Sequence, residues 1–144
     1  MSKSEITLKT FNESYNCSQA VFTTFADELG LDKKTACKIA GAFGGGVARN
    51  GEVCGAVTGA LMAIGLKYWN EELNPADAKT EVTGIANKFI EEFKSKHKSI
   101  RCKELLDADL STEEGRQKMK DENLHEKICS KLVCDAAEIL EKSF

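Results

Sequence analysis

The chain has 144 residues, of which 20 are Lys or Arg and 23 are Asp or Glu, so its net charge at pH 7 is −3. This mild acidity argues against a dedicated nucleic-acid-binding protein, whose contact face is broadly basic. Hydrophobic residues make up 42% and charged residues 30%, the balance of a globular chain rather than a disordered one. The longest uncharged apolar stretch, Val53–Leu66, is shorter than the roughly 20 residues that a membrane-spanning helix needs, so we expect no direct insertion into a membrane.

Cysteine content is the one unusual feature of the composition. The first nine residues contain charges and no apolar run, so we expect no secretory signal and a cytoplasmic location. Six cysteines in 144 residues is well below the ~8–10% of small secreted disulfide scaffolds, and cytoplasmic thiols are normally kept reduced. Six is still many for a cytoplasmic chain of this size, and the excess points towards thiol chemistry.

Helical periodicity dominates the chain. Apolar residues recur at helical spacing and no useful alternating run occurs, which predicts the all-α class. We expect residues 1–144 to form one domain, a single compact helical bundle. In chain order, a short helix is predicted over residues 4–11. Asn16 and Gln19 then form a capping-box pattern that begins the next helix, which Gly30 ends.

The following two helices flank a glycine-rich loop. Asp32 is the expected N-cap of a helix over residues 33–43, with Ile39 among its inward-facing residues, and Gly44–Gly46 end it. After the loop, residues 54–66 are apolar on every side. In a protein without a membrane span, this pattern predicts a helix surrounded by the others, and we expect it to be the central helix of the bundle.

Small residues recur every four positions along this apolar helix. Gly55, Gly59 and Ala63 would let neighbouring backbones come close, although each glycine costs about 1 kcal/mol of helix stability relative to Ala. Close packing or access to a site must therefore offset that cost.

The remaining segments also predict helices. Asn74–Pro75 is a strong start signal, and the apolar stripe that follows continues to Phe93, which makes this the longest helix. Residues 99–106 predict a short helix, and residues 111–120 predict another with a capping box at its start. A final helix is expected from residue 123 to about residue 142.

The cysteines fall in distinct settings along these helices. Cys17 and Cys54 lie in the first turn of a predicted helix, where the dipole and free backbone amides stabilise a thiolate. Cys102 lies in a basic stretch that would also favour its thiolate. Helical spacing puts Cys129 on the buried stripe of the last helix and turns Cys134 towards solvent or a rim.

The glycine-rich loop leads directly to Cys54. Gly44, Gly45 and Gly46, followed by Arg49, supply bare amides and a guanidinium that could surround a negative sulfur or an anion. Plain packing is the preferred interpretation of Cys37, and surface positions are expected for His97 and His125. No Cys-x-x-Cys occurs, so thioredoxin-type and zinc-ribbon signatures are absent and any four-sulfur site must combine remote segments.

Several of these segments together carry a family resemblance. They are Asn16-Cys17-Ser18-Gln19-Ala20, Phe43-Gly44-Gly45-Gly46, Gly51-Glu52-Val53-Cys54-Gly55-Ala56-Val57-Thr58-Gly59 and Arg101-Cys102-Lys103-Glu104-Leu105-Leu106. With them, the chain resembles the redox-active family named for its C_GCAxxG_C_C pattern, which comprises small bacterial or archaeal proteins. The resemblance implies four shared cysteines as the site and an inferred redox activity, and family members are often encoded near transporter genes. The shared cysteines correspond to Cys17, Cys54, Cys102 and Cys129.

The first functional hypothesis is thiol–disulfide exchange or electron transfer, as in a thiol–disulfide oxidoreductase. Cys54 would be the attacking thiolate and Cys17 the resolving partner, with Cys102 and Cys129 as a second pair. The glycines assigned to binding a cofactor or supporting the site are Gly44, Gly45, Gly46, Gly55 and Gly59. The redox partner is unknown, and the resemblance implies a functional link to a membrane transporter.

Two alternatives remain open at the level of sequence. Cys17, Cys54, Cys102 and Cys129 could instead bind an iron–sulfur cluster or another thiophilic metal, because four cysteines are the usual ligand set. The chain could also be a structural or partner-binding helical module whose cysteines only pack. A homodimer is expected if the glycine-rich face is not covered within one chain.

Overall fold

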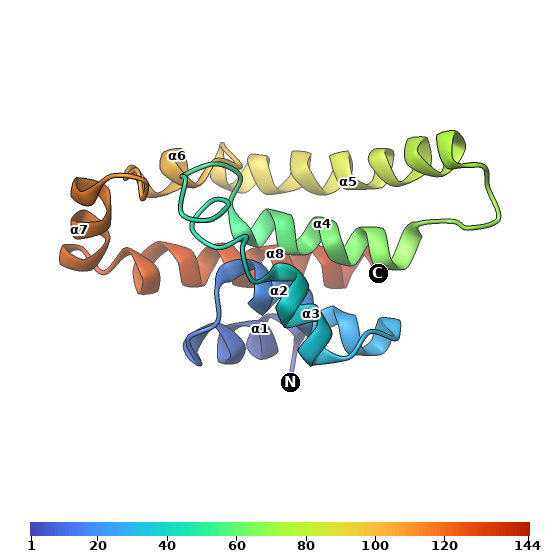
Figure 1. Ribbon diagram of the computed structural model, residues 1–144, viewed down its shortest axis with the longest axis horizontal. Helices are drawn as coiled ribbons and strands as arrows, with labels where there is room; N and C mark the ends of the chain where they lie inside the picture. Colours follow the sequence, from blue (N-terminus) through green and yellow to red (C-terminus); the bar gives the residue numbers. More distant parts are fainter.

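The computed structural model describes residues 1–144 and is all-helical (Figure 1). Its elements are α1 (Lys3–Asn12), α2 (Cys17–Ala26), the 3₁₀ turn η1 (Asp27–Leu29), α3 (Lys33–Ala40), α4 (Gly55–Tyr68), α5 (Pro75–His97), α6 (Cys102–Leu106), α7 (Glu113–Asp121), the π-helical turn η2 (His125–Cys129) and α8 (Ser130–Ser143). No strand is present, and an isolated antiparallel bridge joins Val53 to Arg101. The all-α prediction is therefore confirmed.

Local sequence signals explain where most helices begin. The Asn16 side chain accepts from the Gln19 amide and the Gln19 side chain accepts from the Asn16 amide, so the predicted capping box of α2 is present. Asp32 caps α3 by accepting from the Thr35 amide. Asn74 caps α5, with Pro75 at the first helical position, and α5 is the longest helix, as predicted.

Three helices lie alongside one another, and the N-terminal helices pack against them. In Figure 1, α4, α5 and α8 run along the length of the molecule, and each contacts the other two. Helix α2 packs mainly on α4, and α1 packs mainly on α8. One cluster of 28 buried residues fills the space between them, including Phe11, Phe25 and Phe93.

Helix α4 is only partly enclosed. Most residues of its first two turns are buried, but Leu66 and Lys67 in its last turn are exposed, so the expectation of a helix covered on every side is wrong at this end. The small residues lie at the buried end. A methyl group on Gly59 would lie 2.5 Å from the Ser18 carbonyl oxygen, which is why α2 and α4 can approach so closely.

Helix α3 differs from the prediction in where it ends and in which side chains it buries. Helix α3 ends at Ala40, three residues earlier than predicted, because the chain turns at Gly41 into the glycine-rich loop. Ile39 is 48% exposed and does not face the core. The small buried surface of this short helix comes instead from Ala36 and Ala40.

The second half contains three further differences. Thr112, not Ser111, caps α7, because its hydroxyl accepts from the Gly115 amide. The final helix begins with the π-helical turn η2 rather than a regular turn. His97 is not a surface side chain: its Nε2 lies 2.8 Å from the Asp135 carboxylate, and this half-buried pair ties α5 to α8. No helix combines the length and apolar character required to cross a bilayer.

A candidate thiol site

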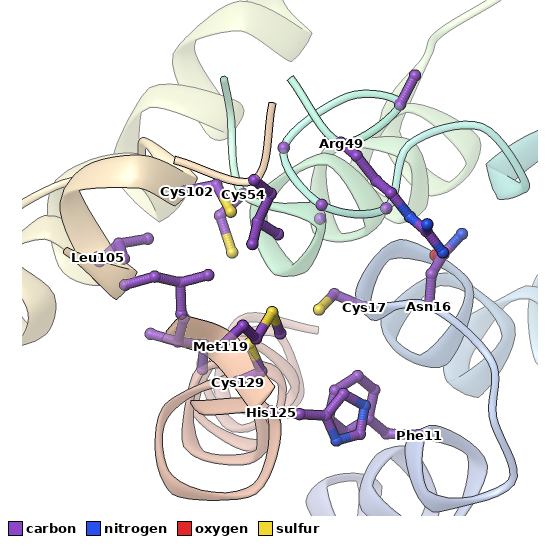
Figure 2. Close-up of a pocket in the computed structure, with 18 of the residues that line it drawn as sticks. Phe11, Asn16, Cys17, Arg49, Cys54, Cys102, Leu105, Met119, His125 and Cys129 are labelled. Atoms are coloured by element: carbon purple, nitrogen blue, oxygen red, sulfur yellow. The ribbon is translucent and has the colours of Figure 1, made fainter. Parts of the chain in front are cut away.

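The four cysteines singled out by sequence line one cavity of about 570 Å³. Figure 2 shows Cys17, Cys54, Cys102 and Cys129 with their sulfurs directed into the same space. All six cysteines of the chain are free thiols. The site therefore combines four thiols from four remote segments, as a chain without a Cys-x-x-Cys requires.

Cys17 and Cys54 come together because α2 and α4 cross at their first turns. Cys17 is the first residue of α2, and Cys54 is the N-cap of α4, one residue before the helix rather than within its first turn. A methyl group on Gly55 would lie 2.8 Å from the Cys17 Cβ and 2.9 Å from the Ser18 amide nitrogen. Only a glycine at position 55 lets the two helix starts approach this closely.

The short bridge between Val53 and Arg101 brings Cys54 and Cys102 to one face. The Cys54 amide donates to the Ile100 carbonyl at 2.7 Å, and the Cys102 amide donates to the Glu52 carbonyl at 2.6 Å. In such an antiparallel pairing, residues 54 and 102 are diagonal neighbours on the same side of the ribbon. Gly46 packs directly behind Cys102, since its Cβ would lie 2.6 Å from the Cys102 Cβ.

Cys129 reaches the cavity from the last residue of the π-helical turn that precedes α8. It is buried, as its place on the stripe of Leu132 and Val133 predicted. A π turn inserts an extra residue into the helix and shifts the angular position of the preceding side chains, and such turns are common at functional sites. His125, four residues earlier, lines the same cavity, stacked on Phe11 with ring centroids 4.1 Å apart (Figure 2).

Burial dominates the protonation of Cys54 and Cys102. It raises the pKa of Cys54 to about 12, although the Ala56 and Val57 amides point at the sulfur and act in the opposite direction. Burial, followed by the nearby Cys54 sulfur, also raises the pKa of Cys102 to about 12. The expectation that the helix start and the basic stretch make these thiols easier to deprotonate is therefore wrong.

The thiols of Cys17 and Cys129 interact, and their pKa values shift in opposite directions. The interaction of the Cys17 thiol with the Cys129 sulfur raises the pKa of Cys17 well above its ordinary value, and burial and the Cys54 sulfur add to this. The same interaction lowers the pKa of Cys129 and outweighs the effect of its burial. Cys129 is the one pocket cysteine of the four whose pKa is lowered.

The glycine-rich loop forms one wall of the cavity. Gly44, Gly45 and Gly46 line it, as does Gly55, whereas Gly59 lies outside it and serves the α2–α4 contact. Beyond the glycines, Val47, Ala48 and Arg49 have φ angles of 63°, 53° and 64°. Three successive L-residues in the left-handed region cost roughly 1–2 kcal/mol each. Backbone hydrogen bonds hold the loop in place, including Arg49 N–H to the Gly44 carbonyl at 3.0 Å.

Several lining residues were not identified from the sequence. The floor contains apolar side chains, and the exposed rim carries basic side chains. These further lining residues are Phe11, Tyr15, Leu105, Leu106, Leu110, Met119 and Leu132 together with Arg116, Lys120 and His125. Most belong to segments that carry no chemical signature of their own. Only the order of the helices could have predicted that these residues line the cavity, because α6 and α7 connect the Cys102 segment to the Cys129 segment.

The arrangement does not fit a metal centre. No group of three or more His, Cys, Asp or Glu side chains is placed so that it could hold a metal ion. The four cysteines are therefore not arranged as the ligand set of an iron–sulfur cluster.

The two other cysteines do not line the cavity. Cys134 is half-buried against α1, where its thiol lies 3.7 Å from the Ser4 carbonyl oxygen, so it does not face open solvent. Cys37 is half-buried on α3, and its carbonyl accepts from the Gln19 side chain at 2.9 Å.

Comparison with known proteins identifies the family. Residues 15–143 match the family model described as "Putative redox-active protein (C_GCAxxG_C_C)". The chain belongs to this family. No curated protein and no solved structure matches the chain. The match covers nearly the whole of this C_GCAxxG_C_C chain and includes all four pocket cysteines.

Proposed function

We propose that this C_GCAxxG_C_C protein is a thiol–disulfide oxidoreductase in which Cys129 is the attacking thiolate and Cys17 the resolving thiol. One observation carries the proposal: Cys17 and Cys129, from opposite ends of the chain, bring their thiols together in the cavity that they share with Cys54 and Cys102. Of the four thiols, that of Cys129 has its pKa lowered by this neighbour. An attacking thiol is most effective when its pKa lies near ambient pH, and its partner must stay protonated until it is needed. The roles differ from the sequence-based hypothesis, which assigned the attack to Cys54.

The exchange has two steps and oxidises the protein by two electrons. The Cys129 thiolate attacks one sulfur of a substrate disulfide, forms a mixed disulfide and releases the first substrate thiolate. Cys17 then loses its proton to the released thiolate or to water and attacks the Cys129 sulfur. A Cys17–Cys129 disulfide forms, the second substrate thiolate leaves, and the substrate gains the two electrons.

The second thiol pair supplies electrons to the first. Cys54 and Cys102 are neighbours on one face of the bridge, and Cys54 is close enough to Cys129 for their charges to interact. Their attack on the Cys17–Cys129 disulfide would leave a Cys54–Cys102 disulfide and return both protons to Cys17 and Cys129. Because burial raises the pKa values of Cys54 and Cys102 to about 12, few of these thiols are ionised at neutral pH and this transfer is slow.

Trapping the mixed disulfide tests the proposal. The reduced protein is mixed with one equivalent of a small disulfide, quenched with acid, and its adducts are mapped by mass spectrometry. We expect a reversible Cys17–Cys129 disulfide, and in Cys17→Ser a stable mixed disulfide on Cys129. Cys37→Ser and Cys134→Ser are matched controls that should leave both products unchanged.

Two results would contradict the proposed roles. Six titratable thiols before and after mild oxidation would exclude the exchange chemistry altogether. A mixed disulfide that accumulates on Cys54 instead of Cys129 would return the attacking role to the residue that the sequence favoured.

A further inference from the structure

The charged side chains around the cavity indicate which kind of substrate it can accept. Its lining includes Arg49, Arg116 and Lys120 and contains no Asp or Glu, although the chain as a whole is acidic. None of these three side chains forms an ion pair with a carboxylate of the chain, and every salt bridge in the structure involves another basic residue. The cavity lining therefore carries positive charge with no carboxylate among its side chains.

A backbone carbonyl holds the Arg116 side chain, and Arg49 lies at the edge of the pocket. The Arg116 guanidinium donates from Nη1 to the Leu110 carbonyl at 3.1 Å, which fixes its position at the cavity. Arg49 is the last residue of the left-handed stretch that follows Gly46, and Figure 2 shows its side chain at the edge of the pocket near Asn16. The chain has a third arginine, Arg101, which does not line the cavity and is paired with Glu52 at 3.3 Å.

The interior differs from the rim. Leu105 and Met119 lie on the way to the sulfurs, opposite Phe11 (Figure 2), and Leu106, Leu110 and Leu132 complete the apolar lining. A cavity of about 570 Å³ falls within the range of small-molecule sites. Its chemistry suits a ligand with an apolar body, a sulfur that reaches Cys129, and negative groups that remain at the rim.

We propose that the substrate of this site is a small organic disulfide that carries carboxylate or other anionic groups. The inference rests on the proposed function and adds its substrate class. Arg49, Arg116 and Lys120 attract and orient the anionic groups, and the Cys129 thiolate attacks the disulfide in the two balanced steps given above. Positive charge at the entrance also offsets the repulsion between an anionic substrate and the thiolate that attacks it.

Three disulfides of different charge test this substrate class. Second-order rate constants of the reduced protein are measured at pH 7.5 with 5,5′-dithiobis(2-nitrobenzoate), which is dianionic, with neutral 2,2′-dipyridyl disulfide, and with dicationic cystamine. We expect Arg49→Gln combined with Arg116→Gln to lower the rate constant for the dianionic probe about tenfold and that for the neutral probe less than twofold. Raising the salt concentration should lower the rate for the dianionic probe and raise that for cystamine.

Matched variants separate charge from structure. Arg101→Gln removes the arginine outside the cavity and should leave all three rate constants unchanged. Arg49→Lys combined with Arg116→Lys keeps the charges and should retain most of the rate with the dianionic probe, whether or not the Gln variant folds fully.

The outcomes distinguish this inference from the proposed function. The substrate class alone would be overturned if Cys129 reacts with the neutral probe but the double Gln variant loses the same fraction of its rate constant with all three probes. The same holds if Arg101→Gln lowers the rate constants as much as the double Gln variant does. If Cys129 reacts with none of the three disulfides, both proposals are overturned.

Discussion

The Cys17–Cys129 pair and the Cys54–Cys102 pair face the same cavity but differ in what controls their protons. Cys54 is the N-cap of α4 and has two amides directed at its sulfur, yet burial raises its pKa to about 12. Cys129 has no helix N-terminus of its own, since it lies within a continuous helical segment, yet its pKa is lowered by the Cys17 thiol. The helix start at Cys54 therefore does not offset the burial of that thiol, whereas the neighbouring Cys17 thiol offsets the burial of Cys129.

The largest expected difference between the pairs is in their rates of alkylation. At pH 8, a thiol with a pKa of about 12 has on the order of a thousand times less thiolate than an ordinary cysteine. Cys129 should therefore react with iodoacetamide at least a thousand times faster than Cys54 and Cys102, as measured by site-resolved mass spectrometry. In guanidinium chloride the six thiols should react at similar rates, and a faster reaction at Cys54 in the folded protein would reverse the comparison.

Unfolding at alkaline pH should measure how much the neutral Cys54 thiol, from the second pair, contributes to the free energy of unfolding. The raised pKa of Cys54 means that the unfolded state loses this proton near pH 9 while the folded state keeps it up to about pH 12. Its contribution to stability is therefore fully present below pH 9 and is lost as the pH rises through this window, by about 1.4 kcal/mol per pH unit.

A comparison of denaturation midpoints from pH 8 to 11 measures this slope. Cys54→Ala should flatten the fall in the free energy of unfolding, whereas Cys37→Ala, outside the cavity, should retain the slope of the unchanged protein. Equal slopes in all three proteins would show that Cys54 is not held neutral by the fold.

Gly55 offers a way to disturb the first pair through its packing. A methyl group at this position meets the Cys17 Cβ at 2.8 Å, so Gly55→Ala should lower the free energy of unfolding by about 1–3 kcal/mol. Gly65, on the same helix, has nothing within 4 Å of an added Cβ, and Gly65→Ala should stabilise the protein by up to about 1 kcal/mol. Urea denaturation measures both, and two effects of the same sign would contradict the close approach of α2 and α4.

Local signals predicted the helices well, because capping residues and apolar periodicity act within a few residues. Asn16, Asp32 and Asn74 each mark a helix start that the structure contains. The four cysteines were also identifiable, through helix position and family resemblance. Their pairing and protonation were not, because both depend on which segments meet: the bridge from Val53 to Arg101 joins residues 48 positions apart, and Cys17 meets a residue from the other end of the chain.

The smallest and most specific test concerns the interaction between the Cys17 and Cys129 thiols. Cys17→Ala removes the donor, so the pKa of Cys129 should rise, and its alkylation rate at pH 7.5 should fall about tenfold for each unit of that rise. Cys17→Ser keeps a hydroxyl donor of similar size and should retain more of the rate than Cys17→Ala. The readout is the pH profile of alkylation at Cys129, with Cys134→Ala as a control whose profile should match the unchanged protein. If Cys17→Ala and Cys17→Ser shift that profile equally, contact with a donor is not what makes Cys129 acidic, and the distinction between the two pairs must come from burial alone.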